Sequence, residues 1–422
     1  MSPACRAVPG FISFSSDVLH GSAQVPSQTC YFSGGVKMKI LMIHPHDVYS
    51  PMEPWTIRIT KFADELVHKG HDVILLYFPM EQYEGAASSK AQLIPLDRQL
   101  SCRAFIRNTA LLYRLARSAD VVHFQKAHFY AAVPALLATV FSGKHLHYDW
   151  DDWEEKIFDV AIPKKTLTSI LTGFSFHVLE HWLPFLADTV SVSSDSLKKL
   201  AINRGAIEKS LVVAPVGGDL SRFYPGRSGE AVRRKFNFQD EIVVFYHGQL
   251  HSCQYVRILL QAIKIIDQTS ADTPLKFMIA GSGSDLHVLQ GISKELGLCQ
   301  KVIFTGFIPH VDIPDYVAAA DICVAPFEDN EVTRCKSPLK IVEYMAAGKP
   351  IVASDVGEVR KMLEGVGLLT KPGSPDEMAE CVLSLATQKP LRVQMSLAAR
   401  QRAEERYNWR CSADNLEKAY TR

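Results

Sequence analysis

The stretch SPLKIVEYMAAGKPIVASDVG, residues 337–357, predicts a helix that is followed at once by a buried strand. Ser337 is a good N-cap, Pro338 suits the first helical position, and Gly348 can end the helix in the left-handed conformation. The apolar run PIVAS then has the length and composition of a strand buried on both faces. A helix leading into such a strand is the repeating unit of a parallel α/β sheet.

The same alternation of strands and helices extends in both directions from this unit. In the second half of the chain, apolar runs predict strands at 242–246, 275–280, 302–305, 322–325 and 350–354. In the first half, they predict strands at 39–43, 72–78, 121–124, 144–150, 189–193 and 210–214. We therefore expect two tandem doubly wound, Rossmann-like parallel-sheet domains, with a substrate between them at the carboxyl ends of the strands.

The boundary between the two domains is expected in the Gly- and Pro-rich stretch APVGGDLSRFYPG, residues 214–226. The expected parts are an N-terminal domain, a C-terminal domain and a terminal helix, at 38–221, 222–402 and 403–422. Residues 1–37 are rich in Ser, Pro and Gly without a sustained period. They are either a disordered extension or a mis-called segment upstream of a natural start at Met38.

The composition excludes several classes of protein. The 422 residues include 46 Lys+Arg and 45 Asp+Glu, and the formal charge of +1 argues against a protein that coats nucleic acid. Hydrophobic residues at 47% and charged residues at 22% are ordinary for a globular protein. The nine cysteines include no C-x-x-C pair, which favours free thiols and a reducing, cytoplasmic compartment over disulfides or a zinc site.

The amino end of the helix that follows Pro338 is expected to point into the cleft between the domains. Free N–H groups and the helix dipole make such an end a site for an anion such as a phosphate. Lys336 and Lys340 flank it, and Glu343 lies further along, where a carboxylate can bind a ribose diol. The alternative is a well-capped surface helix on which Lys340 and Glu343 form an i,i+3 pair.

In the order of its motifs, the chain from Met38 onward resembles the retaining glycosyltransferases of the GT-B fold, also called glycosyltransferase family 4 or group 1. The stretch 327–357 resembles that family's nucleotide-sugar signature, E-x7-E followed by PIVAS, with Glu343 at the second glutamate. The segments GSGSDLHVLQ, VIFTGFIPH and AAADICVAPF are similar to further family segments in the same order. The terminal QRAEERYNWRCSADNLEKAY resembles the family's last helix, which crosses back to the first domain.

This resemblance implies a glycosyltransferase that moves a sugar from a nucleotide-diphosphate donor to an acceptor hydroxyl with retention of configuration. It implies no cofactor and no metal, and an acceptor that is a glycan, a lipid-linked molecule or a small molecule. The pathway would be the synthesis of a cell-surface polysaccharide, glycolipid or other glycoconjugate. In the family, the second glutamate holds the ribose of the nucleotide. The residues expected to contact the donor are Gly248, Gln249, Gln254, Gly281, Gly283, Phe307, Lys336, Ser337, Leu339, Lys340 and Glu343.

Three features depart from the family's pattern. The first glutamate of E-x7-E falls at Cys335, and the basic pair that holds the donor diphosphate falls at Gln249 and Gln254. The glycine-rich loop after the first strand is replaced by SPMEPW, residues 50–55. Either the lysines flanking the helix compensate, or the donor phosphate is altered or the activity is weak. The alternative function is a degenerate, non-catalytic partner subunit that binds a nucleotide sugar.

A second polar cluster, HLHYDWDDWEEK at 145–156, lies at and after a predicted strand. Alternate residues of a strand share a face, which would align His145, His147, Asp149 and Asp151. This alignment and the D-x-D triplet at 149–151 raise a metal-site hypothesis, which the metal-independent fold disfavours. In the family this strand end brings a polar residue to the sugar and acceptor. Asp151 or Asp152 is therefore the candidate catalytic residue, and the alternative is a solvated acidic turn.

His44, His46 and Glu53 lie at and after the end of the first predicted strand. They are candidates for acceptor binding, and the alternative is that they are ordinary surface residues. A nicotinamide-dependent oxidoreductase is disfavoured, because the turn after Ile43 lacks the G-x-G-x-x-G fingerprint.

Two further patterns bear on membranes. The first is a set of basic residues that recur with helical spacing, at Arg103, Arg107, Arg114 and Arg117. Such a stripe suits an anionic membrane at the inner face of the cell, and its alternative is a solvated helix face. No window reaches the length of apolar sequence that a membrane span needs, and the nearest, 167–186, is expected to be a buried or interfacial helix.

Overall fold

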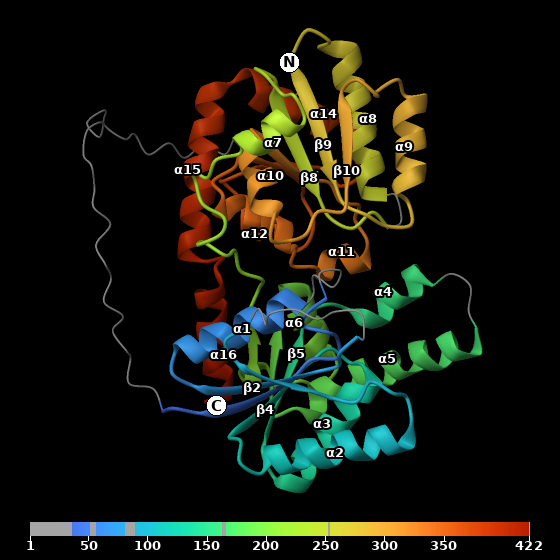
Figure 1. Cartoon of the computed structure of the whole chain (residues 1–422), viewed down its shortest axis with the longest axis vertical. Coiled ribbons are helices and arrows are strands. Elements are labelled where there is room, and N and C mark those ends of the chain that lie inside the picture. The colour runs from blue at the N-terminus through green and yellow to red at the C-terminus, as the bar shows by residue number, and fades with distance from the viewer. Residues whose placement is uncertain (1–35, 51–55, 81–88, 163–165, 252–253, 422) are drawn as a thin grey trace.

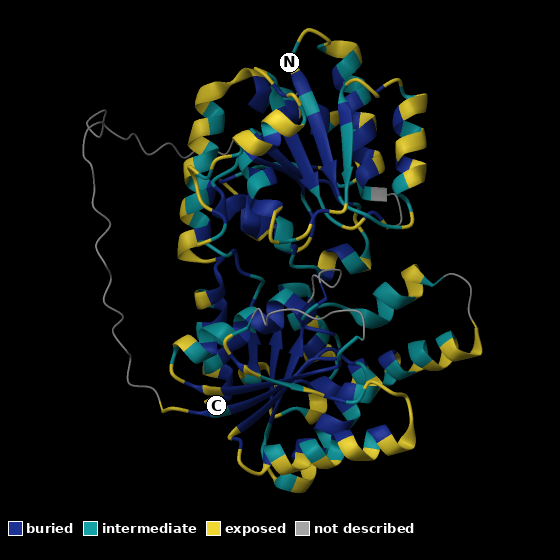
Figure 2. Cartoon of the chain, in the orientation of Figure 1, coloured by how far each residue is buried: buried dark blue, intermediate teal, exposed yellow. Residues whose placement is uncertain are grey.

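The computed structural model describes residues 36–50, 56–80, 89–162, 166–251 and 254–421. The predictions made for residues 1–35 and for Glu53 lie outside the described residues. Within these ranges the chain forms two parallel sheets, each covered by helices, and the buried strands contrast with the exposed outer sides of the helices (Figure 2). The predicted pair of tandem doubly wound α/β domains is therefore confirmed.

The N-terminal domain is built on a parallel sheet. Its strands are β1 (Lys39–Ile43), β2 (Asp72–Tyr77), β3 (Gln92–Pro95), β4 (Val121–Gln125), β5 (His145–Trp150), β6 (Thr189–Val192) and β7 (Leu211–Val213). Its helices are α1 (Thr56–His68), α2 (Cys102–Ala116), α3 (Phe129–Ser142), α4 (Glu154–Ala161), α5 (Leu167–Leu186) and α6 (Asp195–Asn203), and a 3₁₀ turn covers Glu208–Ser210. The strand order is β3-β2-β1-β4-β5-β6-β7 (Figure 1).

The C-terminal domain repeats this design. Its strands are β8 (Ile242–His247), β9 (Leu275–Ala280), β10 (Val302–Gly306), β11 (Ile322–Ala325), β12 (Ile351–Ser354) and β13 (Leu368–Thr370), in the order β10-β9-β8-β11-β12-β13. Its helices are α7 (Glu230–Lys235), α8 (Gln254–Thr269), α9 (Leu286–Glu295), α10 (Ile313–Ala319), α11 (Glu331–Cys335), α12 (Leu339–Ala346), α13 (Glu358–Leu363), α14 (Pro375–Thr387) and α15 (Lys389–Glu405).

The alternation of side chains along the strands separates the two faces of the N-terminal sheet. Leu41 and Ile43 of β1 share a hydrophobic cluster with residues of α2, α3 and α5. Ile40 and Met42 point to the other face, where they share a cluster with α1 and with the last helix, α16 (Trp409–Tyr420). The helices α2, α3 and α5 therefore lie in a row on one face of this sheet.

Helix α16 packs on the N-terminal domain although it follows the C-terminal one in sequence (Figure 1). The ring centroids of Trp409 and Phe62 are 5.7 Å apart, and Tyr420 Oη lies 2.7 Å from His123 Nδ1. The chain crosses back close to the domain boundary, where a Cβ on Gly217 would lie 2.3 Å from the Trp409 nitrogen. Only glycine fits this approach.

Several short elements were not predicted. Strand β3 has four residues at the edge of its sheet, and none of them is buried. Helix α4 likewise has no buried residue, so its sequence carries little hydrophobic periodicity. The helix expected at 167–186 is present as α5, and α4 precedes it.

Candidate active site

The loops that follow β8 and β9 pack against each other through glycines. Gly248 N donates to Ala280 O at 3.0 Å, and Leu250 N donates to Ser282 O at 2.9 Å. Gly281 has φ 151°, and a Cβ there would lie 1.9 Å from Gly248 O. The predicted donor-binding glycines are therefore brought together at the carboxyl ends of neighbouring strands, where doubly wound domains bind their ligands.

Lys340, in the first turn of α12, places its ammonium against these glycine loops. Its Nζ lies 4.1 Å from the ring centroid of Tyr246 and only 2.6 Å from where a Cβ on Gly248 would be. Burial and then repulsion from Lys336 lower the pKa of Lys340 to about 7. Among the residues that the structure describes, no carboxylate is close enough to form an ion pair with Lys340. This cation is therefore open to an anionic ligand.

The amino end of α12 differs from the prediction. Ser337 does not cap the helix, which begins at Leu339 after Pro338 without a side-chain cap. Instead, Ser337 Oγ accepts a hydrogen bond from Val216 N at 3.3 Å, from the segment that joins the domains. The expected N-cap was wrong because this interdomain contact engages the hydroxyl. An uncapped helix start leaves its first N–H groups available to an anion.

Glu343 is buried, with 1% of the residue exposed. Its Oε1 lies 2.5 Å from His310 Nε2, while its Oε2 lies 3.2 Å from His247 Nε2 without the alignment of a hydrogen bond. Burial alone would raise the pKa of Glu343, but the two imidazoles outweigh burial and lower the pKa to about 2. The alternative of an exposed Lys340–Glu343 pair is therefore wrong, because Glu343 is buried against histidines.

The contact with His310 sets a condition on ribose binding. His310 is held in place by Arg222, whose Nη2 donates to the His310 carbonyl at 2.7 Å. Because Glu343 is buried against the imidazoles of His247 and His310, a ribose diol reaches the carboxylate only if a side chain that covers it moves, and the partly exposed His310 ring is the candidate. The role of Glu343 in holding the ribose stays a prediction.

Cys335, at the end of α11, is packed against the N-terminal domain. Ser194 Oγ donates to the Cys335 carbonyl at 2.7 Å, and the side chain joins the hydrophobic cluster beneath α2, α3 and α5. Burial raises the pKa of the Cys335 thiol to about 12, so the side chain is neutral. A glutamate at this position would place a charge in that cluster, which is costly without a partner.

The N-terminal domain contributes a second charged cluster, around Lys126 at the end of β4. Lys126 Nζ lies 3.2 Å from Asp151 Oδ1 and 3.9 Å from Asp152 Oδ2, and it also pairs with Glu154. Burial alone would lower the pKa of Lys126, but these carboxylates raise it. Lys126 has φ 66°, a conformation uncommon for residues other than glycine. The lysine is therefore a fixed cation inside an acidic shell.

The two candidate catalytic aspartates differ in access. Asp151 is buried, accepts a hydrogen bond from Gln125 Nε2 at 2.8 Å, and has a pKa that burial raises to about 7. The Asp152 side chain is 31% exposed. Burial also raises the pKa of Asp152, against the opposing charges of Lys126 and then Lys336. Asp152 thus lies near Lys336 of the C-terminal domain and is the better placed of the two to touch a substrate.

The proposed alignment for a metal site on β5 is broken up by protein contacts. Arg58 donates to both oxygens of Asp149, at 2.9 Å and 2.7 Å, and Ser191 Oγ donates to Asp149 at 2.5 Å. His147 is bonded to the hydroxyls of Thr189 and Ser191. Asp149 is therefore not available as the metal ligand that the D-x-D hypothesis requires. The acidic groups that converge are Asp151, Asp152 and Glu154.

His44 and His46 lie at the end of β1. His44 is fully buried, burial lowers its pKa, and neither of its ring nitrogens has an aligned hydrogen-bond partner. The His46 ring lies 5.3 Å from that of His44 and 4.8 Å from that of His128. Their use in acceptor binding stays a prediction.

The remaining predicted donor residues are more dispersed. Gln249 is exposed, Gln254 begins α8 with a side chain outside the described residues, and Phe307 is 43% exposed after β10. Leu339 packs against hydrophobic clusters of both domains.

The prediction missed Lys126, His247 and His310. Each lies at the end of a strand or in the loop that follows it. The same position, at the carboxyl end of a strand, had made Asp151 a candidate.

Comparisons with known proteins agree with this architecture. Residues 241–388 match the family described as Glycosyl transferases group 1. The D-inositol 3-phosphate glycosyltransferase of Corynebacterium jeikeium is 28% identical over 246 residues, 56% of this chain and 57% of that protein. The chain spans about half the length of the curated relatives that it matches first.

Solved structures match over a larger share of the chain. A glycosyltransferase from Rickettsia africae has a TM-score of 0.70 at 17% identity, covering 91% of this chain and 98% of that one. The Anabaena protein HepE, in complex with UDP-glucose, has a TM-score of 0.70 at 20% identity, covering 91% and 99%. The chain therefore has the GT-B fold, and its residues 241–388 match the model of the group 1 glycosyl transferases.

Proposed function

We propose that the protein transfers a sugar from a nucleoside-diphosphate donor to an acceptor hydroxyl with retention of configuration. The observation that carries this proposal is Lys340. Its ammonium lies at the uncapped start of α12, beside Gly248, without a carboxylate partner among the described residues. A diphosphate supplies the negative charge that this site lacks, and the absence of a side chain on Gly248 makes room for the Lys340 ammonium beside the loop.

The relatives support this class of donor and acceptor. HepE, which shares the fold, was solved with UDP-glucose, and the Corynebacterium relative is named for transfer to an inositol phosphate. Here the donor diphosphate would lie against Lys340 and the glycine loops, and the ribose against Glu343 once His310 has moved. The acceptor would enter from the N-terminal domain, beside Asp152.

The chemistry then follows from where charge develops. As the bond between the anomeric carbon and the diphosphate breaks, negative charge grows on the leaving phosphate oxygen. Lys340 and the first amides of α12 stabilise that charge, in place of the cations that Gln249 and Gln254 do not supply. The acceptor oxygen bonds to the anomeric carbon from the side that the diphosphate leaves. Its proton passes to the departing phosphate, so atoms and charges balance without an enzyme nucleophile.

Asp151 and Asp152 have separate roles in this proposal. Asp152, which is partly exposed, is the candidate for contact with a hydroxyl of the sugar or acceptor. Asp151 is a positioning residue, because its oxygens are held by Gln125 and Lys126. Lys126 opposes the effect of burial on the pKa of both aspartates and holds them in place.

A second candidate function is a partner subunit that binds a nucleotide sugar without transferring it. The observation that favours it is Cys335, which lies in the hydrophobic cluster of the N-terminal domain and offers no charge to a sugar. The two candidates share donor binding and differ in turnover.

The test combines binding with turnover. Titration calorimetry with a panel of UDP-, GDP- and ADP-sugars measures donor affinity, and release of nucleoside diphosphate measures transfer or slow hydrolysis. Lys340→Met is expected to lose donor affinity, whereas the control Lys294→Met, on the exposed side of α9, is not. Binding without release from any donor favours the partner subunit. If no nucleotide sugar binds, or Lys340→Met binds as well as the parent, the proposal fails.

A further inference from the structure

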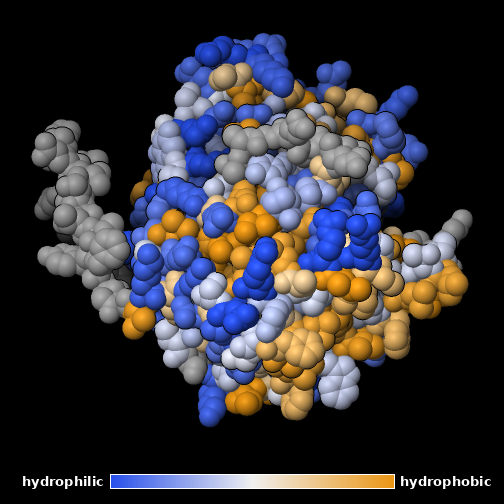
Figure 3. Space-filling view, turned by 60° about the horizontal axis from the view of Figure 1, so that its bottom comes forward, coloured by the Kyte–Doolittle hydropathy of each residue, from blue (hydrophilic) through white to orange (hydrophobic). Residues whose placement is uncertain are grey.

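The outer side of the helical row α2, α3 and α5 exposes an unusual number of large apolar side chains, which we name the apolar face. On α5 they lie along one stripe of the helix, between 46% and 74% exposed: Leu167, Ile170, Leu171, Phe174, Trp182, Phe185 and Leu186. On α2 and α3 they are Ile106, Tyr113, Phe129, Val140 and Phe141. Figure 3 shows hydrophobic residues gathered over the lower part of the molecule, where Figure 1 places this domain.

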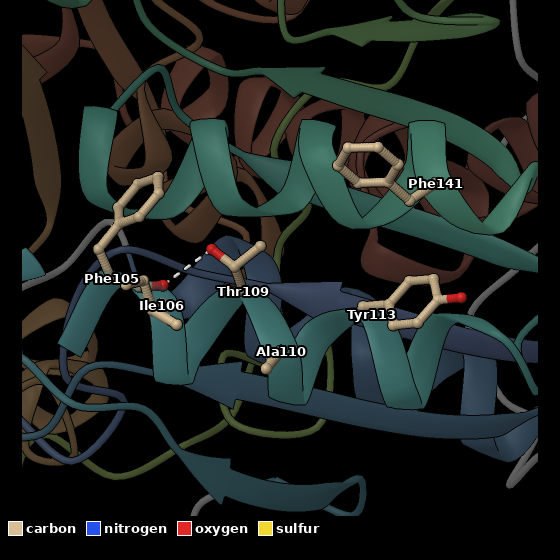
Figure 4. Close-up of a pocket in the computed structure, with 6 residues that line it drawn as sticks. All are labelled: Phe105, Ile106, Thr109, Ala110, Tyr113 and Phe141. Carbon is tan, nitrogen blue, oxygen red and sulfur yellow. Dashed lines mark hydrogen bonds between the residues drawn. The ribbon is translucent and has the colours of Figure 1, made fainter. Parts of the chain in front are cut away.

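The apolar face is continuous across the helices. Phe105 of α2 and Phe129 of α3 stack with ring centroids 6.0 Å apart, and α3 contacts α5. Between α2 and α3 lies an open groove of about 500 Å³, lined by Phe105, Ile106, Thr109, Ala110, Tyr113 and Phe141 (Figure 4). Contiguous apolar surface of this kind is rare on monomeric proteins and marks a site of interaction.

The charges on the same helices indicate the occupant. Arg103, Arg107 and Arg114 of α2 and the C-cap residue Arg117 are all exposed, and they share one outward stripe with Ile106 and Tyr113. Neither α2 nor α3 contains an acidic residue, and the only carboxylate of α5, Glu180, is buried. Two carboxylates of neighbouring segments reach this surface, because Asp97 lies 3.4 Å from Arg107 and Asp159 lines a hollow with Ile170 and Phe174. The four arginines outnumber these carboxylates, and exposed apolar groups flanked by such a basic excess are complementary to a bilayer with anionic headgroups.

We propose that the apolar face docks this domain on the surface of a membrane that contains anionic phospholipid. The apolar side chains of α5 and the groove between α2 and α3 would lie at the level of the acyl chains, and the arginines of α2 would contact the phosphates. In the described part of the chain, no helix has the length and hydrophobicity to cross a bilayer, so this contact would lie on the membrane. The proposal does not depend on the identity of the donor or acceptor.

Vesicle flotation tests this proposal with the full-length protein. Vesicles of phosphatidylcholine that contain phosphatidylglycerol are expected to carry the protein up the gradient, and pure phosphatidylcholine much less. High salt should weaken the binding, because surface charges are screened. Removing the charge of Arg103 or Arg114 by substitution with Gln should weaken binding about fivefold each, the effect of about 1 kcal/mol per arginine at such a surface.

A matched pair of double variants separates the apolar face from apolar surface in general. Ile170→Ser with Phe174→Ser removes side chains that are 50% and 65% exposed, and should weaken vesicle binding by more than about tenfold. Val393→Ser with Leu397→Ser removes equally exposed side chains, 51% and 69%, from α15 of the C-terminal domain and should leave binding unchanged. Unchanged melting temperatures would show that both variants are folded.

Trp182 gives a readout at the site itself. Among the tryptophans that the structure describes, it is the exposed one, so brominated lipids should quench its fluorescence in the parent and not in Trp182→Phe. The proposal is overturned if the protein does not float with anionic vesicles, or if the α5 double variant floats like the parent. It is also overturned if sedimentation shows a dimer that the α5 variant dissociates while vesicles do not bind, because the apolar face would then join two copies of the chain.

Discussion

Two lysines near the boundary between the domains, the buried Lys126 and the partly buried Lys340, have opposite electrostatic surroundings. Lys126 lies among the carboxylates of Asp151, Asp152 and Glu154, which raise its pKa although burial alone would lower it. Lys340 has the ring of Tyr246 as its neighbour, and burial followed by repulsion from Lys336 lowers its pKa to about 7. The first charge is balanced within the protein and the second is not.

This difference separates a scaffold cation from a ligand-binding cation. Removing a balanced cation leaves buried carboxylates without compensation, so stability should fall. Removing an unbalanced cation relieves desolvation and repulsion, so stability should hold while affinity for an anion is lost. The substitution of Lys126, which follows β4, is thus expected to lower stability, whereas that of Lys340, in the first turn of α12, is expected to lower affinity for an anion.

The largest expected effect is on stability, in Lys126→Met. Breaking a buried ion pair by removing one partner typically destabilises a protein by about 3–5 kcal/mol. Chemical denaturation of the full chain measures this change. Lys340→Met is the control, and its free energy of unfolding should fall little or not at all. The comparison breaks down if Lys340→Met is the less stable of the two variants.

Substitution of Glu343 is expected to affect both donor affinity and stability, which the two lysines separate. Hydrogen bonds to charged groups contribute about 1.5–3 kcal/mol, so loss of a ribose contact in Glu343→Ala should weaken donor binding about tenfold to a hundredfold. Because Glu343 also pairs with His310 and His247, this variant should lose some stability, which Glu343→Gln should partly retain. Donor titration and thermal denaturation measure the two effects.

His310→Ala is the matched partner for this experiment. It frees Glu343 Oε1, so donor affinity should be kept or increased if the carboxylate receives the ribose. Equal losses of donor affinity in His310→Ala and Glu343→Ala would show instead that the His310–Glu343 pair shapes the loop, and that the ribose binds elsewhere.

The longer buried elements of the fold were predictable from the sequence, whereas short exposed ones such as β3 and α4, and the pairing of these charges, were not. Strands β1, β4 and β5 are marked by their apolar runs, and Gly348 does adopt positive φ after its helix. The helix start at Ser337 was misplaced, because its hydroxyl bonds to Val216, a residue far away in sequence. Likewise, nothing local to Cys335 shows that it packs in the core of the other domain. Long-range packing decided both.

The pH dependence of donor binding should follow Lys340. Burial lowers the pKa of this lysine to about 7, so in the free protein it begins to lose its proton near neutral pH. Only the ammonium pairs with a diphosphate, so donor affinity should be full below that pKa and fall about tenfold per pH unit above it. Titrations of the protein with the donor, at one pH unit below and two pH units above the pKa of Lys340, measure this change in affinity. Lys340→Met should show a flat profile, and a flat profile in the parent would contradict the assignment.

The smallest expected effect is that of a chelator, which should leave donor turnover unchanged. Asp151, Asp152 and Glu154 converge closely enough to hold a cation, but Lys126 already occupies the space between them with its ammonium. A divalent ion would have to share this acidic shell with a fixed positive charge, while Asp149 stays engaged with Arg58. The measurement is nucleoside diphosphate release in EDTA, with and without added manganese. Loss of turnover that manganese restores would mean that Lys126 leaves the shell and that the N-terminal cluster, not Lys340, supplies the decisive cation.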